Sequence, residues 1–249
     1  MAMGVASVGA AKDGGGVIRV GAVLWMVHSL LILVGTITGL SLLGGGTSAV
    51  TERVTLTGAS FIGACALAFA AALLVGLGLR AYRNLPGAQA SRGPAGLTAV
   101  LLWIYGALAI VPIATLLVMW GGVDFDTLAN GLRAILVAWF IASILLVVAG
   151  LTLSRFVRAL RTERGSAPKG FGWLFAYALV NVVGVAMISL PLLLTPADDV
   201  ALRVAAIGAL IELLAIPIVG LIIFLLLFFE PRRWAMGPPP LTLPPPPPL

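Results

Sequence analysis

Residues 204–229 read VAAIGALIELLAIPIVGLIIFLLLFF, and this stretch decides the fold class of the chain. Glu212 is its one charged side chain, and the run exceeds the roughly 20 apolar residues that a helix needs to cross a bilayer. Five similar stretches precede it, at about residues 20–43, 54–79, 97–120, 134–153 and 171–194. The sequence therefore predicts an all-α, polytopic membrane bundle with six transmembrane helices.

The composition favours lipid as the main solvent of this chain. Hydrophobic residues make up 61% of the 249 positions and charged residues 10%, whereas soluble domains are roughly a quarter charged. The formal net charge of +6 does not indicate nucleic acid, because the basic residues lie in short segments between the apolar stretches. We expect the lipid bilayer as the main partner and no nucleic acid.

The chain divides into three parts by composition. Residues 1–17 are predicted to be a flexible N-terminus, with Gly14, Gly15 and Gly16 as a flexible connector, and Gly44–Gly46 as a second one. Residues 18–234 hold the six-helix domain, and residues 235–249 form a proline-rich, disordered tail. The first apolar run could be read as a signal peptide, but it is longer than the usual apolar region of about 7–15 residues. A retained helix is favoured.

The charges predict the orientation of the bundle. With six spans, all but three of the 15 lysines and arginines fall on one side of the membrane. The three on the other side are Arg53, Arg133 and Arg203. Short loops rich in arginine and lysine face the cytoplasm. We therefore expect a multi-pass protein of the cell membrane with both termini in the cytoplasm.

The helix pairs share a weak repeat. Gly76-Leu77-Gly78-Leu79-Arg80 and Gly150-Leu151-Thr152-Leu153 end the second and fourth spans, and Arg53, Arg133 and Arg203 begin the even-numbered ones. A fixed period of this kind indicates duplication, here of three like-oriented helical hairpins around a shared axis. Unrelated hairpins with apolar helices and basic ends would give a similar pattern, so both interpretations stay open.

The runs Gly76 to Leu85 and Gly150 to Leu160 give the chain a weak resemblance to a known family. Apolar helix pairs with such basic ends resemble an uncharacterised family of archaeal multi-pass membrane proteins. That family has no assigned activity, so the resemblance implies a membrane bundle and no mechanism.

Three polar side chains inside apolar runs are the candidate functional residues. They are Glu212 in the sixth span, His28 in the first and Asn181 in the fifth. Because an ionisable group costs on the order of 3 kcal/mol in the membrane, it usually faces the bundle interior. The functional hypothesis is a proton or cation site in which His28 pairs with Glu212, and the alternative is that these groups only hydrogen-bond helices together.

Small residues and prolines predict close packing and kinks. Ser60, Ala64, Ala68, Ala72 and Gly76 form one stripe on the second span, which favours packing inside the bundle over a homodimer seam. Ala134, Ala138 and Ala142 repeat the spacing on the fourth span. Pro112, Pro191 and Pro217 each leave a backbone carbonyl that a neighbour must satisfy.

Two further features lie at the helix ends. Asp126 is the predicted cap of the fourth span, and the sixth is predicted to begin near Pro196. Arg155, Arg158, Arg161 and Arg164 form a predicted basic stripe that suits anionic lipid headgroups on the cytoplasmic side. Docking of a cytoplasmic protein partner is the alternative for this stripe, whereas a homo-oligomer would use the small-residue stripe of the second span.

Catalytic and metal-binding patterns are missing from the sequence. One cysteine, Cys65, and one histidine rule out an intrachain disulfide, a four-thiolate metal site and bis-histidine haem ligation. No nucleophile, phosphate-binding or zinc-protease motif is present, so we expect no enzyme, no metal and no cofactor. A transporter- or channel-like component is the first hypothesis, and a non-catalytic scaffold or assembly subunit is the alternative.

Overall fold

A computed structural model of the chain describes residues 2–41, 50–83, 89–120, 124–163, 171–194 and 199–235, and each regular element within these ranges is a helix. The elements are α1 (Ala2–Ser41), α2 (Val50–Arg83), α3 (Gln89–Leu108), α4 (Ile110–Trp120), α5 (Phe125–Glu163), α6 (Trp173–Leu194), α7 (Asp199–Leu210), the π-helical turn η2 (Ile211–Ala215) and α8 (Ile216–Ala235). Six segments are long and apolar enough to cross a membrane. The predicted all-α bundle of six spans is confirmed.

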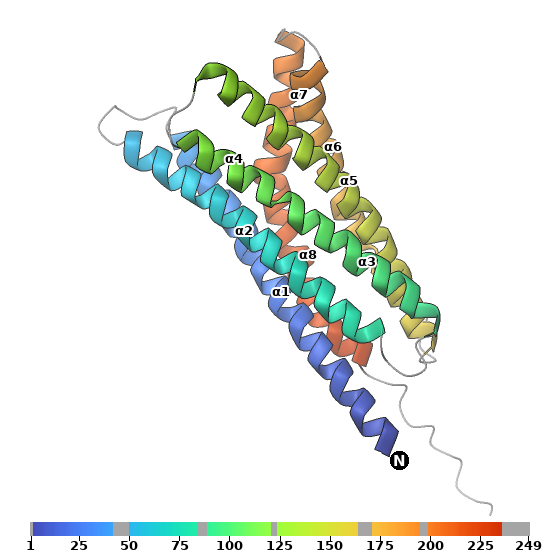
Figure 1. Ribbon diagram of the computed structural model, residues 1–249. Coiled ribbons are helices and arrows are strands. Elements are labelled where there is room, and N and C mark those ends of the chain that lie inside the picture. The colour runs from blue at the N-terminus through green and yellow to red at the C-terminus, as the bar shows by residue number, and fades with distance from the viewer. Residues whose placement is uncertain are drawn as a thin grey trace, which may run out of the picture.

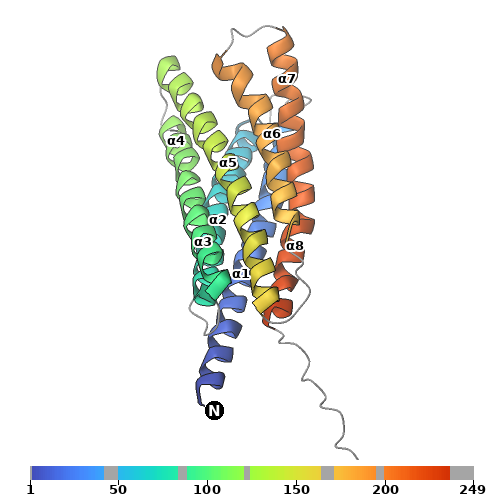
Figure 2. The same ribbon diagram turned by 90° about the vertical axis from the view of Figure 1, so that its right-hand side faces the viewer.

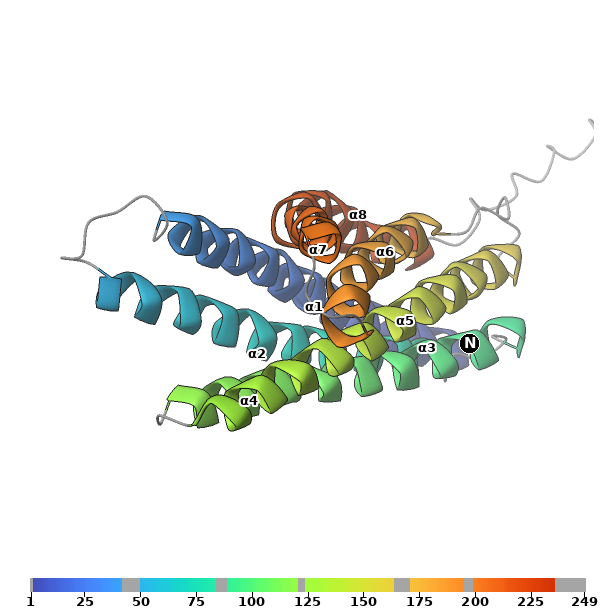
Figure 3. The same ribbon diagram turned by 90° about the horizontal axis from the view of Figure 1, so that it is seen from above.

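The spans form a ring in chain order. Span one is α1 and span two is α2, while α3 and α4 make span three, α5 span four, α6 span five, and α7, η2 and α8 together span six. Each span packs against the next one, and α8 packs against α1 to close the ring. Figure 1 shows the elongated bundle from the side, and Figure 3 shows the ring from above.

The two ends of the bundle differ in charge. The end where α1 begins and α8 finishes also holds Arg80, Arg83, Arg92, Arg155 and Arg158 (Figure 2). We call it the basic end. The opposite end holds Glu52, Asp124 and Asp199, and we call it the acidic end. Arg53, Arg133 and Arg203 also lie toward the acidic end, so the described basic residues are concentrated at the basic end, as the loop pattern predicts, but are not confined to it.

The outer surface of the ring is apolar. Ile37, Leu117 and Ile222 are 62%, 58% and 58% exposed, and many other large aliphatic side chains on all spans are similarly bare. Soluble proteins rarely expose so continuous an apolar surface to water, whereas such a surface is favourable in contact with lipid tails. The bundle is a membrane protein.

The half of the bundle nearest the basic end is densely packed. Trp25 of α1 stacks on Phe224 of α8 with ring centroids 5.1 Å apart, and Tyr177 of α6 meets the same ring edge-on at 5.5 Å. Tyr82 of α2 and Phe156 of α5 form a second edge-on pair at 5.9 Å. These large side chains belong to one continuous buried core that fills the centre of the ring.

Gly14, Gly15 and Gly16 belong to a regular helix, in which Gly14 and Gly15 are buried and Gly16 is exposed. The prediction of a flexible connector at Gly14–Gly16 is wrong, because α1 runs through these residues. A Cβ atom on Gly14 would collide with Ala81, and one on Gly78 would collide with the Gly14 carbonyl. The missing side chains let α1 and α2 approach closely. The predicted connector at Gly44–Gly46 and the proline-rich tail lie outside the described residues.

Two glycines of the predicted repeat both lie where one hairpin contacts the next, Gly76 against a side chain and Gly150 against backbone. A Cβ atom on Gly76 of α2 would meet Trp103 of α3, and one on Gly150 of α5 would meet the backbone of Leu174 and Phe175 of α6. Each glycine thus lets the second helix of one hairpin approach the first helix of the next. The repeat pattern in the sequence corresponds to a repeated packing contact.

The stripe of small residues on α2 lies inside the bundle. Ser60, Ala64, Ala68 and Ala72 are all at most 5% exposed, and Gly76 is also buried. The interpretation as packing within the chain is therefore confirmed, and the stripe is not free to form a homodimer seam.

Two helix ends are capped by carboxylates. The Thr127 amide donates to Asp124 Oδ1 at 2.8 Å, so α5 is capped by Asp124, and the prediction of Asp126 as the cap is wrong. The helix begins two residues earlier than expected, at Phe125. At the basic end, Glu163 in the last turn of α5 accepts hydrogen bonds from the amides of Ala90 and Ser91 and from the Ser91 hydroxyl, at 2.5, 3.1 and 2.7 Å. This carboxylate satisfies the free amides at the start of α3.

The prolines act on the spans in different ways. Span three is broken at Ala109, three residues before Pro112, because proline cannot donate to the carbonyl four residues earlier. Pro191 lies near the end of α6, which continues through it to Leu194. Pro217 follows the π-helical turn η2 in span six. Span six begins at Asp199 within the described residues, and Pro196 lies outside them.

Candidate functional site

A cavity of about 340 Å³ lies between the helices on the acidic side of the packed core. All six spans contribute to its wall, which is mostly apolar and carries a few polar groups. Those with polar atoms are His28, Ser29, Cys65, Tyr105, Trp139, Ser143, Tyr177, Asn181 and Glu212. Ligand sites in proteins have this character: concave, mainly apolar and fitted with a small number of polar groups.

Small side chains on two helices leave the space empty. Ala64 and Ala68 of α2 and Ala138 and Ala142 of α5 all line the cavity and are at most 8% exposed. These are the alanine stripes that the sequence indicates. On the fourth span the stripe borders the cavity at Ala138 and Ala142, whereas Ala134 is exposed.

Glu212 is the one carboxylate on the described wall of the cavity. Its side chain is 3% exposed, and its Oε2 accepts a hydrogen bond of 2.8 Å from Nδ2 of Asn181. Its Oε1 is buried against Gly184 of α6 and has no hydrogen-bond partner among the described residues. A buried carboxylate with an unsatisfied oxygen is costly, so this group is a candidate for function.

The helix that carries Glu212 is locally distorted. Residues Ile211–Ala215 form a π-helical turn, in which the amide of Ile216 donates to the carbonyl of Ile211. Pro217 has no amide to offer the carbonyl of Leu213, and the Thr36 hydroxyl of α1 lies 3.2 Å from that oxygen. A single π-turn inside a helix is often found at functional sites, because it turns side chains away from their regular positions.

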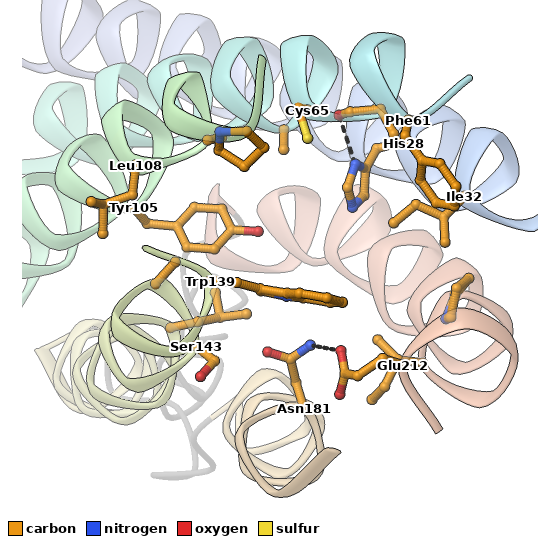
Figure 4. A pocket seen from close by; sticks show the side chains of 18 of the residues that line it. His28, Ile32, Phe61, Cys65, Tyr105, Leu108, Trp139, Ser143, Asn181 and Glu212 are labelled. Atoms are coloured by element: carbon orange, nitrogen blue, oxygen red, sulfur yellow. Dashed lines mark hydrogen bonds between the residues drawn. The ribbon is translucent and has the colours of Figure 1, made fainter. Parts of the chain in front are cut away.

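His28 lies on the opposite wall. Its Nδ1 is 2.7 Å from the carbonyl oxygen of Ala64. A carbonyl can only accept, so Nδ1 carries the hydrogen, and Nε2 of the neutral ring is left as an acceptor. Figure 4 shows the imidazole directed from α1 into the cavity.

The predicted pair of His28 and Glu212 does not form within the described residues. Figure 4 shows the Trp139 indole between His28 on one side and Asn181 and Glu212 on the other. Glu212 is paired with Asn181 instead. The three predicted polar residues nevertheless line one cavity, although they come from three different spans.

Several residues of the wall escaped the sequence analysis. Tyr105, Trp139 and Tyr177 look like ordinary apolar or interfacial residues, and Ser29 and Ser143 look like neutral helix residues. One signal could have found Tyr177, because it precedes Asn181 by one helical turn and therefore shares its face. Ser29 is adjacent to His28, and Ser143 follows Trp139 by the same turn spacing.

The basic stripe is shorter than predicted. Arg155 and Arg158 are exposed at the basic end of α5, but Arg161 turns inward and forms an ion pair of 3.1 Å with Glu230 of α8. A three-residue spacing rotates each side chain around the helix by about 60°, which brings Arg161 to the ring interior. Arg164 lies outside the described residues.

No metal cluster is found in the part of the chain that the structure describes, where no three His, Cys, Asp or Glu side chains are grouped to hold an ion. Comparison with known proteins adds no family: no protein-family model, curated protein or solved structure matches the chain. The resemblance to archaeal membrane proteins therefore stays a prediction. The cavity between the spans is the feature from which function must be argued.

Proposed function

We propose that this protein is a transporter- or channel-like membrane component whose binding site is the cavity between the six spans. The observation that carries this proposal is the position of Glu212, a buried carboxylate that lines a cavity of about 340 Å³ and whose Oε1, packed against Gly184, has no hydrogen-bond partner among the described residues. Helix packing alone does not require a buried carboxylate at this position. Binding of a solute or ion by the Glu212 carboxylate would explain its presence.

The asymmetry of the bundle favours a carrier over an open pore. The cavity lies toward the acidic end, and the aromatic core around Trp25 and Phe224 closes the ring below it. In many carriers the site lies where repeated units meet, and the units rock about it. The break at Ala109 and the π-turn at Ile211–Ala215 both border this cavity and are suited to such movement.

The test is solute flux in proteoliposomes that contain the full chain. Purified protein is first screened for thermal stabilisation by small organic cations, neutral solutes and organic anions, because a ligand that binds the folded state raises the melting temperature. Flux of each stabilising solute is then compared between wild type, Glu212→Gln and Glu52→Gln. Glu52 is exposed at the acidic end, so its variant makes the same chemical change away from the cavity.

We expect Glu212→Gln to reduce flux strongly and Glu52→Gln to leave it unchanged. Full flux in Glu212→Gln, or no flux above that of empty liposomes for any solute, would refute a transport role.

The second candidate is a non-catalytic scaffold subunit. It is favoured by the interhelical hydrogen bonds of the buried polar groups, namely His28 to Ala64, Thr98 to Thr152 and Asn181 to Glu212. A scaffold would bring its complex along when it is extracted in mild detergent. A stable companion at fixed stoichiometry, together with an inert Glu212→Gln variant, would favour this candidate.

We further propose that the basic end faces the cytoplasm, that Arg155 and Arg158 contact anionic headgroups there, and that the protein is not an enzyme. Arginine near the ends of short loops sets membrane orientation. A reporter enzyme that is active only outside the cytoplasm should be inactive when it is fused after residue 249. Activity of this fusion would show that the basic end faces away from the cytoplasm.

A further inference from the structure

We infer that the cavity binds a small organic ammonium ion, an apolar body with one protonated amine. This inference rests on the proposed function, because it names the class of solute for the same cavity. Three independent features of the wall support it: the hydrogen-bonding capacity that is left over, the sign of its charge and its aromatic rings.

Four polar side chains of the wall donate hydrogen bonds within the protein. His28 Nδ1 donates to Ala64, Ser29 Oγ to the Trp25 carbonyl at 3.1 Å and Ser143 Oγ to the Phe140 carbonyl at 2.7 Å. Asn181 Nδ2 donates to Glu212 at 2.8 Å.

The acceptors of these groups and of Glu212 are still available to a ligand. They are His28 Nε2, the lone pairs of the two serine hydroxyls, Asn181 Oδ1 and the Glu212 carboxylate. The hydroxyls of Tyr105 and Tyr177 can act in either sense. Donors also remain on the wall, namely the Trp139 indole N–H, the Cys65 thiol and the second hydrogen of Asn181 Nδ2, so the need for a ligand that brings donors comes from the Glu212 carboxylate, whose Oε1 has no partner among the described residues.

The charge of the wall has one sign. Glu212 is the single carboxylate among the described lining residues, and no arginine or lysine stands among them. A buried carboxylate requires a counter-charge or a proton. An ammonium group supplies both the positive charge and up to three N–H donors.

The rest of the wall suits the apolar body of such a ligand. Phe61, Tyr105, Trp139 and Tyr177 line the cavity together with alanines and aliphatic side chains. Aromatic faces attract cations within about 6 Å of the ring. The volume of about 340 Å³ lies at the small end of the range of about 300–1,000 Å³ for ligand pockets, so the amine must be small.

A hard metal ion fits this wall less well. Calcium takes six to eight oxygen ligands, and magnesium needs near-octahedral oxygen geometry. Here one carboxylate and one amide oxygen project from adjacent positions on α6 and η2, and apolar groups occupy most of the remaining wall. The wall is that of an amine site.

The test measures binding of four matched probes to the full chain in detergent by thermal shift and equilibrium titration. They are 2-phenylethylammonium, its neutral counterpart 2-phenylethanol, the anion 3-phenylpropanoate and sodium ion alone. We expect the amine to bind at least about tenfold more tightly than the neutral and anionic probes, since a charge-assisted hydrogen bond contributes that much. Glu212→Gln should lose this preference, and Glu52→Gln should keep it.

A second variant guards against loss of folding in Glu212→Gln. Ala138→Phe places a ring in the cavity without changing any charge, because Ala138 lines it and is 6% exposed. It should abolish amine binding while the protein still elutes as a single folded species. Unchanged amine binding in Ala138→Phe would place the ligand elsewhere and overturn the inference.

The outcomes separate this inference from the proposed function. If the neutral probe, the anion or sodium binds as tightly as the amine, and this binding depends on Glu212, then the ligand is not specifically an ammonium ion. The proposal that the cavity is the binding site would still stand. If the amine binds in the cavity but does not cross proteoliposomes, the ammonium class stands and transport is wrong.

Discussion

The two halves of the bundle are built from the same six spans but fill their centre differently. Toward the basic end, the ring pairs Trp25–Phe224 and Tyr82–Phe156 belong to one buried core, and each of these side chains is at most 3% exposed. Toward the acidic end, alanines of α2 and α5 face one another across a cavity. The sizes of the inward-facing side chains therefore decide where the ring is closed and where it is hollow.

Two tryptophans express this difference most clearly. Trp25 stacks on Phe224 in the packed half, whereas Trp139 lies across the cavity in the hollow half. A tryptophan thus fills the core in one half and lines the cavity in the other. The sequence pattern that predicts a buried tryptophan does not show whether it lines a cavity.

The largest expected effect is that of Trp25→Ala. Truncation of a buried tryptophan leaves an unfilled space, and we expect a loss of about 3–5 kcal/mol in the free energy of unfolding. Trp139→Ala should cost much less stability, because its ring already borders empty space, but it should weaken amine binding. Reversible unfolding in mixed micelles measures both. Equal losses of stability would erase the distinction between the halves.

Gly184→Ala should have the next largest effect. A Cβ atom at this position would collide with Glu212 Oε1 and Ile211, so the carboxylate must shift. We expect a stability loss of about 1–3 kcal/mol from overpacking and a parallel loss of amine affinity. Gly16→Ala is the control, since a Cβ atom there meets nothing within 4 Å and alanine favours a helix. Full amine affinity in Gly184→Ala would show that the position of Glu212 is unimportant.

A pair of threonines compares hydrogen bonds in the two halves. Thr98 donates to Thr152 at 2.8 Å in the packed half, and Thr36 lies beside the Leu213 carbonyl at the π-turn. Thr98→Val and Thr36→Val should each cost at most about 1 kcal/mol of stability, because each hydroxyl shares its one hydrogen with a carbonyl of its own helix, Pro94 for Thr98 and Ile32 for Thr36. Thr36→Val alone should also change amine binding, measured by titration. A binding change in Thr98→Val would mean that the packed half takes part in the site.

The smallest effect is expected at Asp124 on the acidic end. Hydrogen bonds from the Thr127 side chain and amide lower the pKa of this carboxyl below its ordinary value. A lowered folded-state pKa stabilises the start of α5 above the unfolded pKa of about 4, and this contribution is lost as the pH falls through the folded pKa.

Hydrogen exchange at the first turn of α5 checks this prediction. Asp124→Ala should lower the protection of these amides at pH 7, and the difference from wild type should shrink as the pH falls through the folded-state pKa of Asp124, which lies below the ordinary value. Global stability should stay nearly constant. A difference that persists in acid would mean that the charge of Asp124 is not what caps the helix.

The sequence predicts the spans well because crossing lipid demands length and apolarity, which are local properties. All six stretches became helices, and the proline at position 112 marks the break at Ala109. The helix ends were less predictable. Asp124 and Asp126 are equally good caps on residue type, and only the structure shows that the Thr127 amide meets Asp124.

The candidate site was half predictable. Glu212, His28 and Asn181 stand out because polar groups in apolar runs are rare, and all three line the cavity. Their partners depend on which spans become neighbours. Only the structure therefore shows that Asn181 pairs with Glu212 and that the Trp139 indole lies between these two residues and His28. The cavity itself follows from alanines on two spans that are far apart in the chain, and single-helix patterns cannot show that they face each other.

Glu163 has a consequence for the order in which the protein is made. This residue in the last turn of α5 accepts the hydrogen bonds of Ala90 and Ser91 at the first turn of α3. A ribosome produces α3 long before it reaches position 163, so the nascent α3 emerges with its first amides unsatisfied by this carboxylate. The start of α3 therefore gains these hydrogen bonds only after α5 has been made. A chain that is stalled within α5 still lacks them.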